Sequence, residues 1–176
     1  AWLNLINAIL MYVALIAVFV CLCFELPGGW DAVEATMTAS PDTAWMTSIF
    51  GNSSLIIGFA IPSALGASLF HGVAQTGYQP IATAKSNKAV KKSLWFAGPI
   101  NGCFCIIPAL IGLAAFSIVA YNQYGSMMMT PMMLVDLLPK PVLGLLMAGF
   151  LGVDLSSFAV MALAPTMFFI SIMSAL

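Results

Sequence analysis

The stretch Val142–Leu163, VLGLLMAGFLGVDLSSFAVMAL, decides the fold class of this chain. As a helix it is long enough to cross the ~30 Å apolar core of a bilayer. Its only charged residue is Asp154, followed closely by Ser156 and Ser157. If the helix begins near Val142, Asp154 lies roughly 18 Å along it, close to the bilayer centre. Because a carboxylate and two hydroxyls are costly at that depth, this cluster is the first candidate for a functional site.

The composition places the rest of the chain in the membrane as well. The 176 residues are 62% apolar and 6% charged, with a mean hydropathy of +1.06, whereas soluble domains have about 25% charged residues. The length allows roughly four spans, and the apolar runs predict an all-α membrane protein with spans at about 3–25, 46–73, 93–120 and 141–172. Both ends lie within apolar helical patterns, and no signal-peptide pattern is present. We therefore expect a fragment of a longer membrane protein, whose remaining helices would be its partners.

The distribution of charge predicts an orientation. Four of the five positive charges fall in the loop 82–93, which the positive-inside rule assigns to the cytoplasm. The acidic segment 25–46 would then face outward, and the chain would be a multi-pass protein of the cytoplasmic membrane. We interpret the lysines mainly as a topology signal, with binding of lipid headgroups as a smaller role. No basic, aromatic-rich patch indicates a nucleic-acid partner.

The second predicted span contains Gly58, Pro62 and Gly66 near its centre. Proline removes a backbone donor and clashes with the preceding turn, so this span is either a kinked helix or a broken helix that lines a site. The preceding segment 30–45 has a tryptophan at each end. We expect a short interfacial helix and a loop there, because tryptophan prefers the membrane interface.

Other residue groups have mainly structural interpretations. Cys21/Cys23 and Cys103/Cys105 lie in apolar helices without metal-site spacing. The methionine-rich stretch 127–133 could hold copper, but a flexible apolar segment is the favoured interpretation. No nucleophile–base pair or metal motif is found, so we expect neither an enzyme nor a cofactor.

The polar residues in the other spans predict helix packing. Asn4, Asn7 and Asn101 are expected to form hydrogen bonds between helices. Either serine beside Asp154 could instead bond back to a carbonyl one turn earlier, such as that of Val153 for Ser157. His71 is the only histidine, and a single hydrogen-bonded helix residue is its simplest role.

Several stretches, in matching order and spacing, resemble the sodium:solute symporter family. The start Trp2–Asn7 resembles that family's Trp-Thr-Asp-x-x-Gln, and Gly28-Gly29-Trp30 resembles a Gly-Gly outer loop. The sequence QTGYQPIATAKS at 75–86 is similar to its Gln-x-x-x-Gln-Arg-x-x-x-Ala-Lys stretch. Residues 97–114, with Pro108, resemble the following helix. Leu138-Pro139 and GLLMAGFLGVDLSS at 144–157 resemble its Leu-Pro loop and Ser-Ser helix.

The resemblance implies a LeuT-type inverted-repeat fold, in which these spans are the fifth to eighth of ten core helices and belong to the region of the second repeat. It also implies sodium-coupled transport of a small polar solute by alternating access, with sodium as the coupling ion. The sodium ligands would be the Val153 carbonyl, Ser156 and Ser157, completed by a helix outside this chain. The candidates to line the substrate site are Gly66, Ser68, Phe70, His71 and Gln75.

The chain also departs from the family pattern. Asn4 replaces an Asp, Pro80 replaces the Arg, and Asp154 has no counterpart. Asp154 is therefore a candidate proton or cation site of its own. Ala74 and Thr76 stand where sugar-carrying members have Asn and Tyr, which argues against a sugar. Two alternatives stay open: a symporter-like sensory or binding membrane domain, and a proton-translocating membrane subunit of a larger complex that uses Asp154 and His71.

Overall fold

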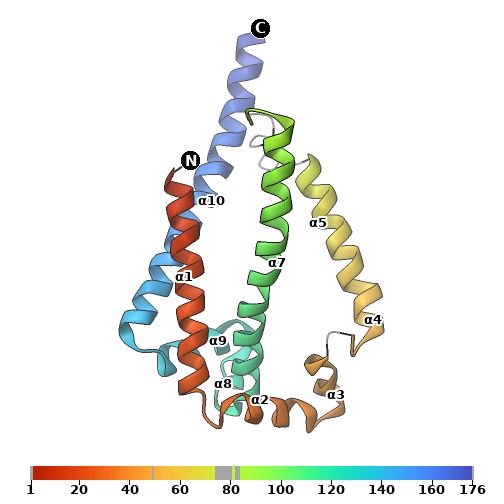
Figure 1. The fold of residues 1–176 in the computed structure, drawn as a ribbon, viewed down its shortest axis with the longest axis vertical. Coiled ribbons are helices and arrows are strands. Elements are labelled where there is room, and N and C mark those ends of the chain that lie inside the picture. The colour runs from red at the N-terminus through yellow and green to blue at the C-terminus, as the bar shows by residue number, and fades with distance from the viewer. Residues whose placement is uncertain (1, 49, 74–80, 82–83, 176) are drawn as a thin grey trace.

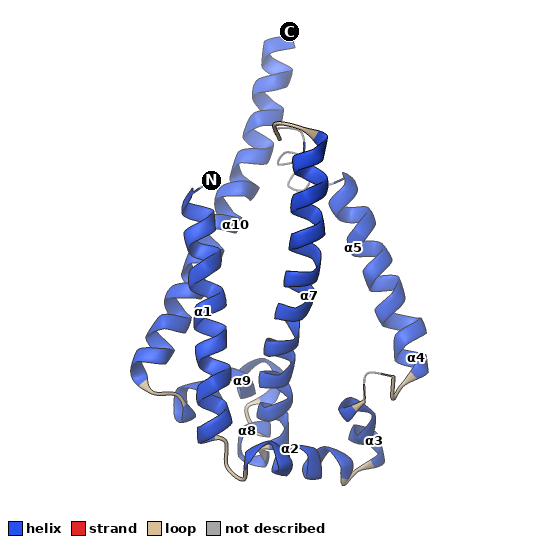
Figure 2. Cartoon of the chain, viewed as in Figure 1, coloured by secondary structure: helices blue, strands red, loops and turns tan. Residues whose placement is uncertain are grey.

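The computed structural model describes residues 2–48, 50–73, 81 and 84–175, and this part of the chain is helical, with turns and without strands (Figure 2). Within these ranges, four helices are long and apolar enough to cross a membrane: Asn4–Glu25, Ser53–Phe70, Asn87–Ser117 and Lys140–Met167. These agree with an all-α membrane protein. The elements are α1 (Trp2–Glu25), α2 (Gly29–Thr38), α3 (Pro41–Ala44), η1 (Trp45–Thr47), α4 (Ser53–Leu55), η2 (Ile56–Ala60), α5 (Ile61–Val73), α7 (Asn87–Ser117), α8 (Val119–Asn122), α9 (Gly125–Leu137) and α10 (Lys140–Ala175).

The long helices alternate in direction (Figure 1). α1 and α7 run one way, and the rod formed by α4, η2 and α5 runs the other way, as does α10. The short helices α2, α3, α8 and α9 gather at one end of the molecule, and α7 starts at the opposite end. The lysines at the start of α7 and the acidic segment around α2 therefore lie at opposite ends, as the charge pattern predicts.

The turn from α1 into α2 depends on two glycines after Pro27. Gly28 and Gly29 have φ values of 76° and 68°, a left-handed conformation that other residues rarely adopt. A Cβ on Gly28 would also lie 2.8 Å from Cβ of Ala32. This turn ends the first span and starts α2, which confirms the expected short helix, whereas the expected loop up to residue 45 contains α3 and the start of η1.

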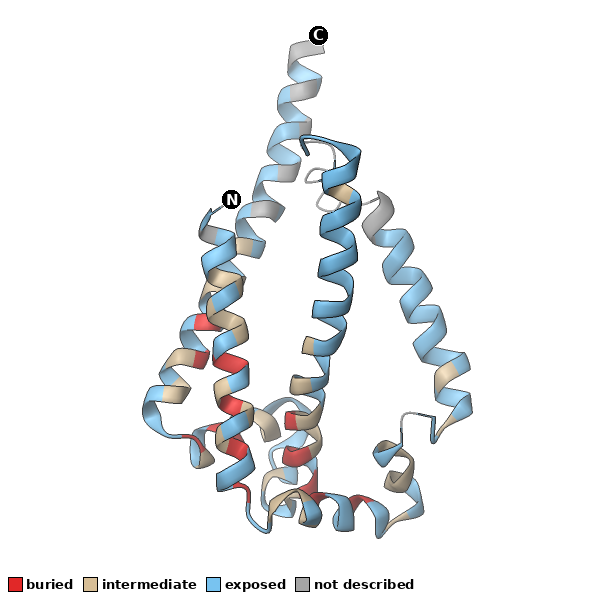
Figure 3. Cartoon of the chain, viewed as in Figure 1, coloured by how far each residue is buried: buried red, intermediate tan, exposed pale blue. Residues whose placement is uncertain are grey.

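The buried core lies toward the end that carries α2, α8 and α9 (Figure 3). α1 and α10 approach closely at Gly149. A Cβ built on this glycine would lie only 3.3 Å from Cα of Met11. Small residues at such a crossing let two backbones pack tightly in lipid, where the hydrophobic effect does not drive helix association. The core residues are Ala14, Leu15, Val18 and Leu22 of α1, Val33 and Met37 of α2, Ile111, Ala114 and Ala115 of α7, Met133 and Leu134 of α9, and Leu146 of α10, together with Leu26 and Leu138.

The second span differs from its predicted start at residue 46. Residues 41–47 form α3 and η1, and the helix begins at Ser53, where Oδ1 of Asn52 accepts a hydrogen bond of 3.0 Å from the Leu55 amide. Pro62 does not break the helix, because the rod continues to Val73. The turn Ile56–Ala60, just before Pro62, is a π-helix, and in a regular α-helix the proline ring would clash with the carbonyl four residues earlier.

The ends of the other spans are set by local residues. α7 begins at Asn87 because Oγ of Ser86 accepts a hydrogen bond of 3.2 Å from the Ala89 amide. It ends at Ser117, before Ile118 adopts an extended conformation. α10 runs from Lys140 to Ala175 and remains helical at Pro165. The third span is thus displaced toward the N-terminus relative to the predicted range 93–120, and the fourth is slightly longer than 141–172.

Candidate functional site

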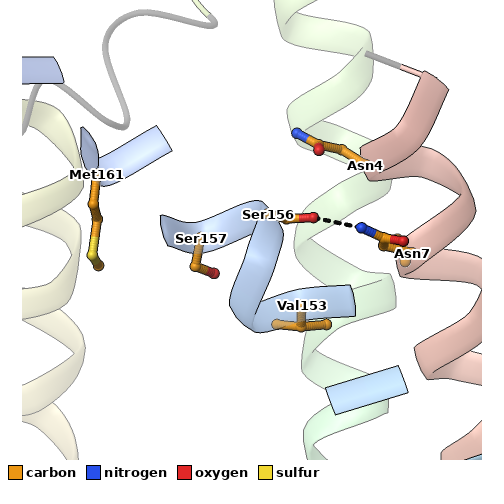
Figure 4. A pocket seen from close by; sticks show the side chains of 7 residues that line it. Asn4, Asn7, Val153, Ser156, Ser157 and Met161 are labelled. Carbon is orange, nitrogen blue, oxygen red and sulfur yellow. Dashed lines mark hydrogen bonds between the residues drawn. The ribbon is translucent and has the colours of Figure 1, made fainter. Parts of the chain in front are cut away.

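A pocket of about 370 Å³ lies between α1 and α10 (Figure 4). The three residues predicted to bind sodium, Val153, Ser156 and Ser157, all line it. The opposite wall is formed by the start of α1, within the stretch Trp2–Asn7. This stretch resembles the symporter family, but its asparagines were predicted only to form hydrogen bonds between helices. The full set of lining residues is Asn4, Asn7, Ala8, Val153, Ser156, Ser157 and Met161.

Asn7 connects the two helices at this pocket. Its Nδ2 donates hydrogen bonds of 2.9 Å to the Gly152 carbonyl and 2.8 Å to Oγ of Ser156. Gly152 allows this contact because a Cβ there would lie 3.1 Å from Cγ and Oδ1 of Asn7. The prediction that Asn7 forms a helix-packing hydrogen bond is confirmed, and its partners are now known.

The two serines of the cluster have different environments. Oγ of Ser156 donates a hydrogen bond of 2.9 Å to the Gly152 carbonyl one turn earlier and accepts the bond from Asn7. The back-bond expected for one of the serines is therefore made by Ser156. Ser157 is exposed, its hydroxyl lies apart from the hydrogen bond between Asn7 and Ser156 (Figure 4), and it has no hydrogen-bond partner among the described residues. Ser157 thus offers the unoccupied hydroxyl, beside Val153 four residues earlier.

Asp154 lies outside this pocket. It is exposed and is not a lining residue, and the described part of the chain provides no partner for its carboxylate. Since successive residues of an α-helix are about 100° apart, Asp154 and Ser156 cannot share a face. Ser156 therefore faces α1 and Asp154 faces away from it. Ser157, three residues after Asp154, lies between these two directions and still lines the pocket.

The structure does not bring the substrate-lining candidates to this pocket. Gly66, Ser68 and Phe70 are exposed residues of α5, which contributes nothing to the pocket wall. Oγ of Ser68 donates a back-bond of 2.7 Å to the Ala64 carbonyl. His71 belongs to α5, but its side chain lies outside the described part, and Gln75 lies outside the described residues altogether.

A second polar contact joins α1 to α7. The hydroxyl of Tyr12 donates a hydrogen bond of 2.7 Å to Oδ1 of Asn101, and the ring of Tyr12 packs edge-on against Phe104 at a centroid distance of 4.3 Å. Asn101 therefore packs helices as predicted. A pocket of about 380 Å³ adjoins this contact, and it is lined by Tyr12 and residues of α7 from Pro99 to Ile107.

The cysteines and methionines were the candidate soft ligands for a metal. All four cysteines are free, and the described residues contain no group of three or more His, Cys, Asp or Glu that could hold a metal ion. In α9, Met133 is fully buried in the core whereas Met127 is 88% exposed. The methionines are thus divided between the core and the surface, which favours packing over copper binding.

Comparison with known proteins adds no further assignment. No model of a known protein family matches the chain. No curated protein and no solved structure is found to be similar to it. The function is therefore inferred from the chemistry of the pocket and from the sequence motifs.

Proposed function

We propose that this chain is part of a sodium-coupled symporter of LeuT-type architecture, which transports a small polar solute across the cytoplasmic membrane by alternating access. The observation that carries the proposal is the lining of the pocket between α1 and α10. The polar side chains that line it are neutral: the amides of Asn4 and Asn7 and the hydroxyls of Ser156 and Ser157. Neutral oxygens that replace a hydration shell suit a hard monovalent cation.

Ser156 can bind a cation without losing its present hydrogen bonds. A hydroxyl has one donor and two acceptor lone pairs. Its proton goes to the Gly152 carbonyl and one lone pair accepts the bond from Asn7, so the second lone pair is available. Ser157 and the carbonyl of Val153 would supply two further oxygens from the adjacent turn. The resemblance to the symporter family implies that the remaining ligands come from a helix outside this chain.

The pocket favours sodium over a proton as the coupling ion. None of its lining residues titrates near neutral pH, and Asp154 lies on another part of the helix surface. A proton carrier would need a titratable group in contact with the ion path. Asn7 donates a hydrogen bond directly to Ser156. Binding of an ion at Ser156 would therefore affect α1 through the same contact that joins α1 to α10.

The proposal is tested with the full-length protein in proteoliposomes. Uptake of candidate solutes is measured with and without a sodium gradient, and sodium-dependent thermal stabilisation is measured in parallel. Loss of one ligand oxygen in Ser157→Ala should raise the required sodium concentration by about tenfold, equal to ~1.4 kcal/mol. Thr166→Ala is the matched control, because Thr166 is in the same helix, makes a back-bond to the Ala162 carbonyl and does not line the pocket.

Three results would decide against the site or the activity. If Ser156→Ala combined with Ser157→Ala leaves the sodium dependence unchanged, the sodium site is elsewhere. If sodium stabilises the protein but drives no uptake of any solute, a sensory or binding domain replaces the symporter. Uptake that follows a pH gradient, without regard to sodium, would support the proton-translocating alternative.

A further inference from the structure

The charged residues of this chain are separated into two poles. Lys85, Lys88, Lys91 and Lys92 lie at or just before the start of α7. No carboxylate occurs anywhere in the sequence between Asp42 and Asp136. Five of the six acidic residues lie in or beside the elements at the opposite end of the molecule, in α1, α2, α3 and α9 (Figure 1). The sixth, Asp154, lies in the middle of α10, so no acidic residue of the described part lies in or beside the start of α7.

Three of these lysines form a stripe with a tryptophan. Lys88, Lys91, Lys92 and Trp95 follow the spacing i, i+3, i+4, i+7, which places them on one face of α7. All three lysines are exposed, and Trp95 is 81% exposed. We call this set the lysine–tryptophan stripe. Its indole lies about one helical turn, roughly 5 Å, further into the span than the nearest ammonium groups.

This arrangement is unfavourable for the isolated helix. Like charges three and four residues apart repel each other. Positive side chains at the N-terminal end of a helix also oppose the helix dipole. No carboxylate among the described residues lies in or beside the start of α7 to offset these costs, so an anion from outside the chain would stabilise the stripe.

The position of Trp95 indicates which anion. Tryptophan prefers the level of the lipid headgroups, so the lysines one turn earlier lie at the level of the lipid phosphates. We propose that the lysine–tryptophan stripe is a binding site for an anionic phospholipid headgroup, with the phosphate between the ammonium groups of Lys88, Lys91 and Lys92 and the indole of Trp95 against the glycerol and upper acyl region. The site is distinct from the pocket between α1 and α10 and does not depend on ion coupling.

Fluorescence quenching at Trp95 tests this site in the reconstituted protein. The probe is a phosphatidylcholine vesicle with a minor fraction of phosphatidylglycerol, and bromine is placed on one lipid or the other. The difference between the parent protein and Trp95→Phe isolates the signal of Trp95. Brominated phosphatidylglycerol should quench well beyond its mole fraction, and the preference should fall about fivefold for each lysine removed. It should also weaken at high ionic strength.

A residue exchange separates lipid binding from the topology signal. The exchange swaps two pairs of neighbouring residues, by Lys88→Ala with Ala89→Lys and by Lys92→Ser with Ser93→Lys. It keeps the composition and the number of charges in the segment. It moves two ammonium groups about 100° around the helix, away from Trp95. The exchanged protein should keep its orientation and its helix content by circular dichroism but lose most of the phosphatidylglycerol preference. Quenching that matches mole fraction in the parent, or an undiminished preference after the exchange, would overturn the proposal.

Discussion

Asn7 makes the only side-chain hydrogen bonds between α1 and α10 that the described residues show. Both protons of its amide are used, one on the Gly152 carbonyl and one on Ser156. In a membrane such a side chain holds two helices in register, and each bond contributes about 0.6 to 1.7 kcal/mol. The residue therefore fixes the geometry of the candidate ion site as well as the packing.

Asn7→Ala should lower the free energy of unfolding in detergent by about 1 to 3 kcal/mol, because two acceptors lose their donor. Asn4→Ala is the control, since Asn4 lines the same pocket but is exposed and makes no hydrogen bond within the described part of the chain. The two variants are compared by thermal unfolding. Equal losses would show that the contact of Asn7 contributes nothing specific.

Some single residues of the candidate site could be predicted from the sequence. The motif at 144–157 led to Val153, Ser156 and Ser157, and these residues do line one pocket. The partnership of Asn7 with Ser156 could not be predicted, because the two residues are far apart in the sequence and only the packing of α1 on α10 brings them together. Helical spacing does separate Asp154 from Ser156, and that signal was available in the sequence.

Helix packing at the crossing of α1 and α10 depends on the absence of a side chain at Gly149. A Cβ there would lie 3.3 Å from the backbone of Met11, whereas a Cβ on Gly144 in the same helix would meet nothing within 4 Å. Alanine raises helix propensity by about 1 kcal/mol at either position. Only Gly149→Ala has to push another backbone aside.

Gly144→Ala should therefore leave the midpoint of thermal unfolding unchanged or raise it, and Gly149→Ala should unfold at a lower temperature than Gly144→Ala. The comparison cancels the propensity term, so the difference reports the close approach itself. If both alanine variants have the same midpoint, α1 and α10 do not pack as closely as the structure indicates.

Tyr121 in α8 makes stability depend on pH. Burial, and then the nearby carboxylate of Asp136 in α9, raise the pKa of Tyr121 above its ordinary value of 10.0. As the pH rises above this value, the phenol ionises in the unfolded chain before it does so in the folded one. The contribution to stability is thus complete below the ordinary value and is lost as the pH rises through the folded pKa.

Tyr121→Phe should reduce the loss of stability between neutral and strongly alkaline pH, measured by unfolding midpoints across that range. Tyr124→Phe removes only the smallest cause of the raised pKa of Tyr121 and should have a much smaller effect. A pH dependence that is the same in Tyr121→Phe and in the parent would show that α8 and α9 do not protect this phenol.

The helical elements were largely predictable, and their ends were not. Apolar runs and the Pro27-Gly28-Gly29 breaker predicted four spans and a short helix after the first. The displaced starts at Ser53 and Asn87 depend on caps by Asn52 and Ser86, which hydropathy does not detect. The helix is continuous through Pro62 and has a π turn just before it. A proline in the sequence calls for some local adjustment but does not specify which one.

For the whole molecule, the two charged poles predict one orientation in the membrane. Single cysteines introduced as Ser86→Cys and Ser40→Cys, in a protein whose native cysteines are replaced by alanine, should differ in accessibility. An impermeant maleimide added to intact cells should label position 40, beside α2, and position 86 only after the membrane is opened. Labelling of position 86 in intact cells would invert the orientation inferred from the lysines.

The separation of charge also determines how the membrane voltage acts on this protein. A potential difference does work of ~2.3 kcal/mol per elementary charge per 100 mV, but only on charge that moves through the field. The lysine pole and the acidic pole lie at the ends of the spans, so the voltage does no work on them as long as they stay there. Within the described part of the chain, Asp154 is the one charged side chain far from a helix end. Under the proposed symport, currents that depend on voltage would originate from the coupling ion or from Asp154, and an Asp154→Asn variant would separate these two sources.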